Sequence, residues 1–214
     1  MRIVIIGAGS MAEGIATRAL TGSHSVGLLD RNPGKAAGVA DELRRRVPGA
    51  EVAAGERADV AGADVVVLAL PYPAGKDVAA EYGQLLDGRV VVDISNPVDF
   101  ATFDSLTVPA GTSAAEEIAH VASAGARVVK AFNTNFAATL VAGEVAGTPL
   151  DVFIAGDDPA AKRTVADLVT SGGMRPLDAG PLRRARELEG FQLLQMAMQE
   201  TLGTNWASAV TILP

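Results

Sequence analysis

Residues 2–16 of the chain read RIVIIGAGSMAEGIA, and this stretch decides the fold. The β-branched run of residues 2–6 predicts a buried strand, and a helical pattern takes over within the motif G-x-G-x-x-A that follows. Gly7 lets the chain turn sharply out of the strand, and Gly9 lets a ligand approach the backbone because it has no side chain. Ala12 is small enough for the helix to pack closely on the strand. The stretch therefore predicts a strand, a glycine turn and a helix.

A helix that begins at such a turn presents free backbone N–H groups, which together with the helix dipole favour an anion. An acidic residue, Asp30, follows where Rossmann-type proteins hold the ribose of a dinucleotide. The motif therefore predicts a dinucleotide site at the turn, formed by Gly7, Ala8, Gly9, Ser10 and Met11. A glycine turn in another kind of α/β protein is the alternative.

The composition narrows the classes of protein to which the chain can belong. Of its 214 residues, 49% are hydrophobic, 20% charged and 4% aromatic, which favours a tightly packed α/β structure with a sizeable core. The net charge of −7 and the lack of a long basic run argue against nucleic-acid binding. Because the chain has no cysteine, disulfides, thiolate catalysis and cysteine-bound metals are excluded. The first residues form a core strand and no apolar run reaches transmembrane length, so we expect a cytoplasmic protein without membrane contact.

Strand-like and helix-like segments alternate along the chain, which is the pattern of a doubly wound sheet. Residues 95–111 form a long loop with two prolines, and loops of that length are often functional. We expect strands at 2–6, 25–29, 51–53, 65–70, 90–93, 127–131, 151–155 and 174–177, and helices at 10–21, 33–47, 57–61, 73–86, 113–122, 135–142 and 159–171. The predicted fold is a Rossmann-type doubly wound parallel sheet of the α/β class.

The last part of the chain has a different pattern. From Leu182 onward, apolar residues recur every three or four positions, which predicts a helix that is either continuous or broken at Gly190 and Gly203. We expect a dinucleotide-binding domain at 1–181 and a small helical segment at 182–214. The apolar stripe of that segment either faces the core of the main domain or forms a dimer interface, and a helix with two apolar faces does both.

Ligands of an open parallel sheet bind beyond the carboxyl ends of its strands. The residues at these ends are polar at intervals and include few strong acids or bases. Asn96 and Asn133 are either partners of a carboxamide or ribose, or caps of their own loops. Besides the glycine turn, the residues expected at this edge are Asp30, Arg31, Leu70, Pro71, Ser95, Asn96, Ala131 and Asn133.

The segment after the second strand bears on the choice between NAD and NADP, and it points both ways. Asp30 can accept hydrogen bonds from the ribose diol of NAD, and its carboxylate repels a 2′-phosphate. Arg31 and Lys35 can hold the 2′-phosphate of NADP, unless they belong to an ordinary surface turn. These residues leave both cofactors open.

The sequence offers no catalytic acid or base and no metal centre. The two histidines, His24 and His120, precede a strand and lie within a helix, and we expect structural or solvent-facing roles for both. Hydride transfer between two bound rings needs flat sites placed face to face and not a proton acceptor, so it fits better than alcohol oxidation. The aromatic residues that could stack on a second ring are Tyr72, Phe132, Phe136 and Trp206.

Positive charge gathers where the last helix is predicted to begin. The residues in its first turn include Arg183, Arg184 and Arg186, although the helix dipole disfavours positive charge there. Because broken local rules tend to mark function, this cluster, with Arg175, is a candidate site for an anionic ligand tail or a partner. The alternative is a solvated face with ion pairs to Glu187 and Glu189.

Five segments carry a resemblance to known proteins: GAGSMA at 7–12, SNP at 95–97, SAAE at 113–116, VVKAFNT at 128–134 and RPLDAGPL at 175–182. In these segments the chain resembles the NADP oxidoreductases that depend on the deazaflavin coenzyme F420. It is also similar to the cytoplasmic reductase domains of six-transmembrane metalloreductases. The resemblance covers nearly the whole chain and implies a Rossmann-type domain with a small helical C-terminal part, which is usually dimeric. It also implies hydride transfer between NADP(H) and a deazaflavin, or a flavin in the metalloreductase branch.

The resemblance implies roles for the site residues as well. It assigns the pyrophosphate to Gly9, Ser10 and Met11, the 2′-phosphate to Arg31 and Lys35, the wall of the nucleotide to Leu70 and Pro71, and the nicotinamide side to Asn96, Ala131 and Asn133. Asp30 departs from the small hydroxyl residue that the family commonly has there, so NAD(H) stays possible. No haem partner is implied, because the transmembrane part of the metalloreductases is absent.

We therefore expect an NAD(P)-dependent oxidoreductase that passes hydride to a deazaflavin or flavin. Two other hypotheses stay open. One is an NAD(P)H-dependent reductase of another small acceptor, such as an imine. The other is a non-catalytic dinucleotide-binding sensor or partner-binding module.

Overall fold

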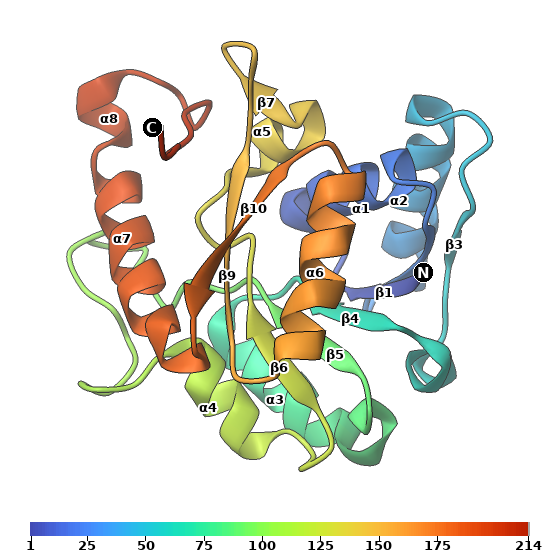
Figure 1. The fold of residues 1–214 in the computed structure, drawn as a ribbon. Helices are drawn as coiled ribbons and strands as arrows, with labels where there is room; N and C mark the ends of the chain where they lie inside the picture. Colours follow the sequence, from blue (N-terminus) through green and yellow to red (C-terminus); the bar gives the residue numbers. More distant parts are fainter. Residues whose placement is uncertain (214) are drawn as a thin grey trace.

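The computed structural model describes residues 1–213, in which one sheet carries helices on both faces (Figure 1). The predicted strands and helices are present up to residue 142, and the long loop at 95–111 holds only a bridge between Val98 and Leu106. The elements in this part are β1 (Arg2–Ile6), α1 (Ser10–Thr21), β2 (Ser25–Leu29), α2 (Pro33–Arg46), β3 (Val52–Ala54), the 3-10 helix η1 (Arg57–Gly62), β4 (Val65–Leu68), α3 (Tyr72–Tyr82), the 3-10 helix η2 (Gly83–Leu86), β5 (Val90–Asp93), α4 (Ala114–Val121), β6 (Arg127–Lys130) and α5 (Ala137–Ala142).

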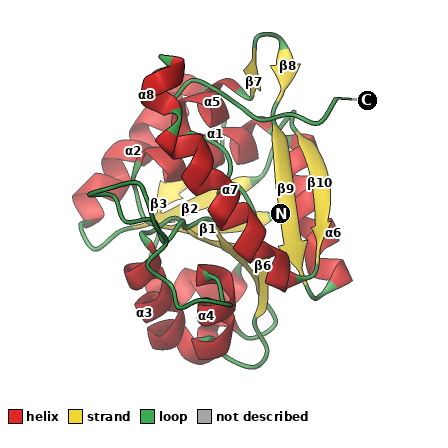
Figure 2. Ribbon diagram, turned by 90° about the vertical axis from the view of Figure 1, so that its left-hand side faces the viewer, coloured by secondary structure: helices red, strands yellow, loops and turns green. Residues whose placement is uncertain are grey.

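The second part contains a hairpin and a helix break that differ from the predictions. Its elements are β7 (Glu144–Val145), β8 (Thr148–Pro149), β9 (Asp151–Gly156), α6 (Pro159–Ser171), β10 (Arg175–Gly180), the 3-10 helix η3 (Leu182–Arg184), α7 (Ala185–Ala197) and α8 (Gln199–Leu202). The short β7–β8 hairpin was not predicted. The last helix is continuous through Gly190 and breaks instead at Met198, and Gly203, with a φ of +61°, ends α8. Figure 2 shows α7 and α8 across one side of the sheet, with the tail running past the hairpin.

The order of the strands places the functional edge of the sheet. The eight strands lie in the order β10-β9-β6-β5-β4-β1-β2-β3, and all pairs from β3 to β6 are parallel. The chain moves outward from β1 to β2 and β3, and then crosses back to β4 on the other side of β1. The strand order therefore reverses between β1 and β4, where ligands bind in doubly wound folds. This confirms the predicted Rossmann-type fold.

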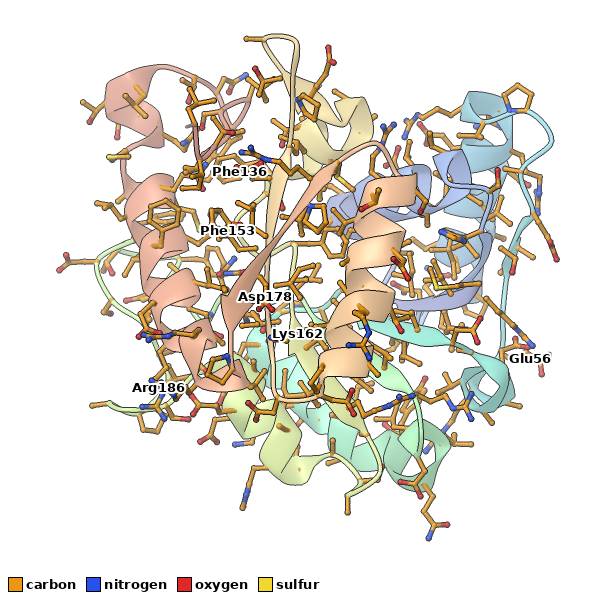
Figure 3. All side chains as sticks on the ribbon, in the orientation of Figure 1. Glu56, Phe136, Phe153, Lys162, Asp178 and Arg186 are labelled. Atoms are coloured by element: carbon orange, nitrogen blue, oxygen red, sulfur yellow. The ribbon has the colours of Figure 1, made fainter. Side chains whose placement is uncertain are left out.

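One strand pair departs from the parallel pattern that we predicted. β9 runs antiparallel to β6, with Lys130 opposite Ala155, and β10 is parallel to β9. After β6 the chain forms α5, which packs on α1 and does not run back along the sheet, so β9 enters from the edge at which β6 ends. α6 then covers this pair, and its Lys162 lies 2.8 Å from Asp178 of β10 (Figure 3).

The sheet has a hydrophobic core on each face, because successive side chains of a strand point to opposite faces. Ile3 and Ile5 of β1 belong to the core under α1, α2 and α6. Val4 and Ile6 belong to the core under α3 and α4, which also takes up Leu182 at the start of the C-terminal part. Within residues 1–213, no helix is long and apolar enough to cross a membrane.

Candidate functional site

The glycine turn has the geometry that its sequence predicts. Gly7 has a φ of +112°, and a Cβ atom there would lie 2.3 Å from the carbonyl oxygen of Ala69. Gly9 has nothing within 4 Å of its Cβ position, so the space above its backbone is open. No side chain caps the helix that starts at Ser10. Open space and free N–H groups at a helix start fit the pyrophosphate of a dinucleotide.

A second small residue matters in this helix, and the sequence interpretation missed it. A Cβ atom on Gly14 would lie 2.8 Å from Cβ of Leu140 and 3.0 Å from the carbonyl oxygen of Ala137. Gly14 thus allows α5 to pack directly on α1. Ala12 is fully buried, as expected from its packing role.

The carboxylate of Asp30 accepts hydrogen bonds from the backbone around it. Its Oδ2 accepts a hydrogen bond from the N–H of Ala8 at 3.1 Å, and its Oδ1 accepts one from the N–H of Asn32 at 2.9 Å. Nζ of Lys35 lies 4.0 Å from Oδ2, and Arg31 is exposed. The carboxylate therefore stabilises the glycine turn, while the two cations beside it stay accessible.

A cleft of about 770 Å³ extends from the glycine turn across the sheet edge to the C-terminal tail. Of the predicted site residues, those that line it are Gly9, Ser10, Met11, Leu70, Pro71, Ser95, Asn96 and Asn133. The structure places outside this cleft Gly7, Ala8, Asp30, Arg31, Lys35 and Ala131. Ile94, which directly follows the predicted strand at 90–93, lines the cleft as expected of a strand end. The lining residues that the sequence did not reveal are Glu13, Ala69, Phe100, Asn135, Ala137, Ala138, Val141 and Met196.

The cleft holds a single ionisable side chain among the described residues. Glu13 lines it, and its Oε1 lies 2.6 Å from Nη2 of Arg46, so the carboxylate is neutralised by an ion pair. The histidines lie elsewhere. Burial lowers the pKa of His24, which contacts the chain's amino group and Ser171, and His120 lies within α4. The cleft is therefore suited to a reaction that exchanges no proton with a side chain.

Asn96 and Asn133 bind each other. Nδ2 of Asn133 donates to Oδ1 of Asn96 at 3.0 Å, and Nδ2 of Asn96 donates to the backbone oxygen of Asn133 at 2.8 Å. Nδ2 of Asn133 also lies 3.2 Å from the carbonyl oxygen of Leu188 in α7. The amide pair thus joins the loops after β5 and β6 to the C-terminal helix, and Oδ1 of Asn133 has no partner within residues 1–213.

A buried ion triad lies next to this amide pair, and the sequence interpretation missed it. Nζ of Lys130 lies 2.7 Å from Oδ2 of Asp93 and 2.7 Å from Oε1 of Glu189, and all three side chains are 0% exposed. Lys130 also donates to the carbonyl oxygen of Ser95 at 2.6 Å. A lysine directly after the apolar pair Val128 and Val129 of a central strand is the signal that could have revealed it.

The charges of the triad depend on one another. Burial opposes the charge of Lys130, but Asp93 and Glu189 outweigh it and raise the lysine's pKa. Burial raises the pKa of Glu189, and Lys130 partly offsets this. Oε2 of Glu189 also accepts a hydrogen bond from the N–H of Ala114, at the start of α4, at 3.0 Å. One buried carboxylate therefore links α7 to the start of α4 and to Lys130 at the end of β6.

The arginines at the start of the C-terminal part are largely paired within the chain. The ion pairs are Arg186 with Glu116, Arg184 with Glu187, and Arg175 with Asp151 (Figure 3 labels Arg186). Arg183 and Arg184 lie in η3, before α7 begins. Glu189, expected as a surface partner, is buried against Lys130, so that part of the interpretation was wrong. The pairs favour a solvated face over an anion site.

Two of the four aromatic residues that could stack on a second ring lie in the cleft. Phe136 and Trp206 line the cleft, whereas Tyr72 and Phe132 do not. The ring of Trp206 stands at 90° to that of Phe136, with centroids 5.3 Å apart. An aromatic wall therefore lies in the cleft, which begins at the glycine turn.

Comparisons with known proteins agree with this geometry. Residues 2–97 match the family described as NADP oxidoreductase coenzyme F420-dependent. The F420-dependent NADP reductase of Methanocaldococcus jannaschii is 30% identical in an alignment 210 positions long, which covers 92% of this chain and 92% of that protein. Metalloreductase STEAP3 of Rattus norvegicus is 34% identical over 192 residues, and the chain spans 36% of that protein's length. The structure of a candidate F420-dependent NADP reductase from Arthrobacter sp. FB24 has a TM-score of 0.79 and 30% identity, over 99% of both chains.

The fold and these relatives define an NAD(P)-dependent oxidoreductase with a Rossmann-type fold. The chain belongs to the F420-dependent NADP oxidoreductase family, which confirms the resemblance seen in the five sequence segments. The roles of single site residues stay predictions.

Proposed function

We propose that the chain transfers hydride between NADP(H) and a deazaflavin, coenzyme F420, or a flavin in its place. The observation that carries the proposal is the division of one cleft into an open helix start at Gly9 and an aromatic wall at Phe136 and Trp206, with its single carboxylate ion-paired. NADPH supplies a hydride and becomes NADP⁺, and the acceptor takes that hydride and a proton from solvent. The protein's part is to align two rings and exclude water.

The proposed placement of NADP(H) follows the edge of the sheet. Backbone N–H groups of Ser10 and Met11 bind the pyrophosphate beside Gly9. Leu70 and Pro71 cover the nucleotide on one side. The nicotinamide end lies at the loops after β5 and β6, where the residues that line or support the site are Ser95, Asn96, Ala131 and Asn133.

The surroundings of Asp30 support NADP over NAD. Both carboxylate oxygens accept hydrogen bonds from backbone N–H groups, so they are less available to a ribose diol. Arg31 is exposed and Lys35 is 53% exposed in its side chain, at the start of α2 where a 2′-phosphate is also favoured by the helix dipole. The two cations therefore outweigh the single carboxylate.

Replacing Arg31 and Lys35 together with alanine is expected to weaken NADPH binding roughly 10- to 100-fold, because charge-assisted hydrogen bonds to the 2′-phosphate are lost. The affinity for NADH, which lacks that phosphate, changes less than about 3-fold. Nicotinamide fluorescence titrations measure both. Arg45→Ala, at the exposed far end of the same helix, is the matched control. An equal loss for NADH, or a wild-type preference for NADH, contradicts this assignment.

An anaerobic assay with NADPH tests the proposed function directly. Oxidised F420, FMN and a small imine serve as acceptors in parallel reactions. Reduction of F420 or FMN is the expected result. Reduction of the imine alone supports a reductase of another small acceptor. NADPH binding without reduction of any of the three supports a non-catalytic sensor.

We also propose that the chain forms a homodimer through its C-terminal part. The residues Phe191, Leu194, Met198 and Leu202 lie on one stripe of α7 and α8 and are 37%, 56%, 40% and 53% exposed. Most of the exposed large hydrophobic side chains lie in this part of the chain. We therefore expect the stripe to pack against the same stripe of a second copy, which removes both from water. The division into a domain at 1–181 and a helical segment at 182–214 belongs to the same proposal.

The dimer predicts a molar mass of twice 21.8 kDa by light scattering. Leu194→Asp, which puts a charge into the centre of the stripe, is expected to give a folded monomer, because Leu194 is exposed within one chain. Its unfolding midpoint no longer depends on protein concentration, whereas that of the dimeric wild type does. A monomeric wild type, or a dimeric Leu194→Asp variant, rules out this interface.

A further inference from the structure

The turn after α8 is built around one buried side chain, Gln199. The residue is 4% exposed, and its Oε1 accepts hydrogen bonds from Oγ1 of Thr204 at 2.6 Å and from the N–H of Trp206 at 3.2 Å. Its Nε2 donates to Oγ of Ser208 at 3.0 Å and to the carbonyl oxygen of Gln195 at 2.9 Å. One amide therefore fixes both sides of the turn to α7.

This turn holds Trp206 in an unusual backbone conformation. Gly203, Asn205 and Trp206 have φ values of +61°, +49° and +61°. The left-handed region suits glycine and tolerates asparagine, but a bulky aromatic residue rarely adopts it. Such backbone strain persists only where the surrounding structure enforces it, and it often occurs at ligand sites.

The tail beyond the turn is fastened to the sheet. Oδ2 of Asp151, at the start of β9, accepts hydrogen bonds from the N–H of Ile212 at 2.8 Å and from Oγ1 of Thr211 at 3.1 Å. Arg175 of β10 pairs with the same carboxylate and also donates to the tail. Trp206 is thus held from both sides, by Gln199 before it and by the sheet after it.

Trp206 lines the cleft and also a second cavity, which it shares with Phe103 and Gln199. Its ring packs on Phe136, which caps α5, and on Phe103 of the long loop, with centroids 5.3 and 6.2 Å apart (Figure 3 labels Phe136). Phe103 in turn meets Phe100 at 5.7 Å. Trp206 stays 41% exposed although it touches these rings, so one of its surfaces is free to meet a ligand.

We propose that Trp206 is the platform on which the ring of the hydride acceptor stacks, and that it restricts the acceptor to planar fused heterocycles. This inference rests on the proposed hydride transfer. The acceptor needs one face against the nicotinamide, and Trp206 covers its other face and keeps water out. The platform contributes to acceptor binding and not to NADPH binding, since the residues that hold the dinucleotide belong to other elements.

Trp206→Leu is expected to raise the KM for F420 or FMN about 5- to 100-fold, the range that base–aromatic stacking covers, with the dissociation constant of NADPH within about 2-fold of wild type. Trp206→Phe keeps a flat ring and is expected to restore most of the acceptor affinity. Tyr82→Leu removes an aromatic ring outside the cleft, at the end of α3, and is the matched control. A Trp206→Leu enzyme with wild-type acceptor KM overturns the proposal. So does a parallel loss of NADPH affinity, which indicates a structural role.

Because Trp206 is the only tryptophan in the chain, binding can also be followed without turnover. In the complex with NADP⁺, oxidised FMN or F420 is expected to quench the intrinsic fluorescence at concentrations that match its KM. If FMN or F420 quenches the fluorescence but the protein reduces neither, the stacking role of Trp206 is supported and the proposed hydride transfer is refuted. If the wild type reduces an acceptor but shows no saturable quenching, the proposed hydride transfer is supported and the stacking role of Trp206 is refuted.

Discussion

Replacing Gly9 with aspartate is expected to lower NADPH affinity at least about 100-fold while leaving the fold as stable as wild type or slightly more stable. The Cβ position of Gly9 meets nothing within 4 Å in the protein, and its φ and ψ of −91° and −178° suit any residue. Aspartate is moreover a preferred N-cap, and its charge is favoured at a helix start. In the proposed placement of NADP(H), the same carboxylate would occupy the space of the pyrophosphate and repel it.

Substitutions at two other glycines separate an effect on NADPH binding from an effect on folding stability. Gly38→Ala, in an exposed part of α2 with nothing within 4 Å of its Cβ position, should raise the unfolding free energy by up to about 1 kcal/mol without changing NADPH affinity. Gly7→Ala should fail to fold stably, because its Cβ atom would lie 2.3 Å from the oxygen of Ala69. Urea denaturation and nicotinamide fluorescence measure the two quantities. NADPH bound by Gly9→Asp with wild-type affinity would falsify the placement of the pyrophosphate.

Lys130→Met is expected to cost about 3–5 kcal/mol of the unfolding free energy, a large part of what a domain of this size has. Methionine fills much of the same volume but leaves Asp93 and Glu189 buried side by side without a cation. Removing one of the two negative charges as well, in Lys130→Met with Glu189→Gln, should recover part of the loss. Lys76→Met, which breaks a partly exposed ion pair with Glu117, is the control and should cost less than about 1 kcal/mol.

The pH dependence of this variant gives a second readout. Burial already raises the pKa of Glu189 in the intact triad, and losing Lys130 raises it further. A carboxyl group whose pKa is higher in the folded than in the unfolded state stabilises the fold at low pH and loses that contribution as the pH rises through the folded pKa. The Lys130→Met variant should therefore gain stability relative to wild type between pH 7 and pH 5. A deficit that is constant over this range is incompatible with two unpaired carboxylates.

Much of the fold could be predicted from the sequence, because its strands are short apolar runs bounded by turns. The glycine turn and the strands of the parallel half follow from local pattern alone. The direction of β9 does not, since nothing in residues 151–156 specifies which way a buried strand runs. Gly190 does not break α7, because its neighbours continue the hydrogen-bonded helix around it.

The site was harder to predict, because its parts depend on contacts between distant residues. Gly9, Asn96 and Asn133 lie at strand ends, and the topological rule brought them into one cleft. Glu189 looked like a surface residue beside three arginines, yet it lies against Lys130 of a strand far earlier in the chain. Trp206 was one aromatic among several, and only the hydrogen bonds of Gln199 show how it is held.

The buried triad also bears on the order in which the protein assembles. During synthesis the ribosome releases β5 and β6 long before α7, so Asp93 and Lys130 can meet while Glu189 is still being made. The N–H groups of Ala114 and Ala115 donate to the same carboxylate, which comes 75 and 74 positions later in the sequence, so they have no such acceptor before Glu189 is made. Docking of α7 therefore brings a second carboxylate to Lys130 and, in the same late step, gives the N–H groups of Ala114 and Ala115 their acceptor. A nascent chain therefore does not complete this side of the cleft until α7 has docked against the ends of β5 and β6.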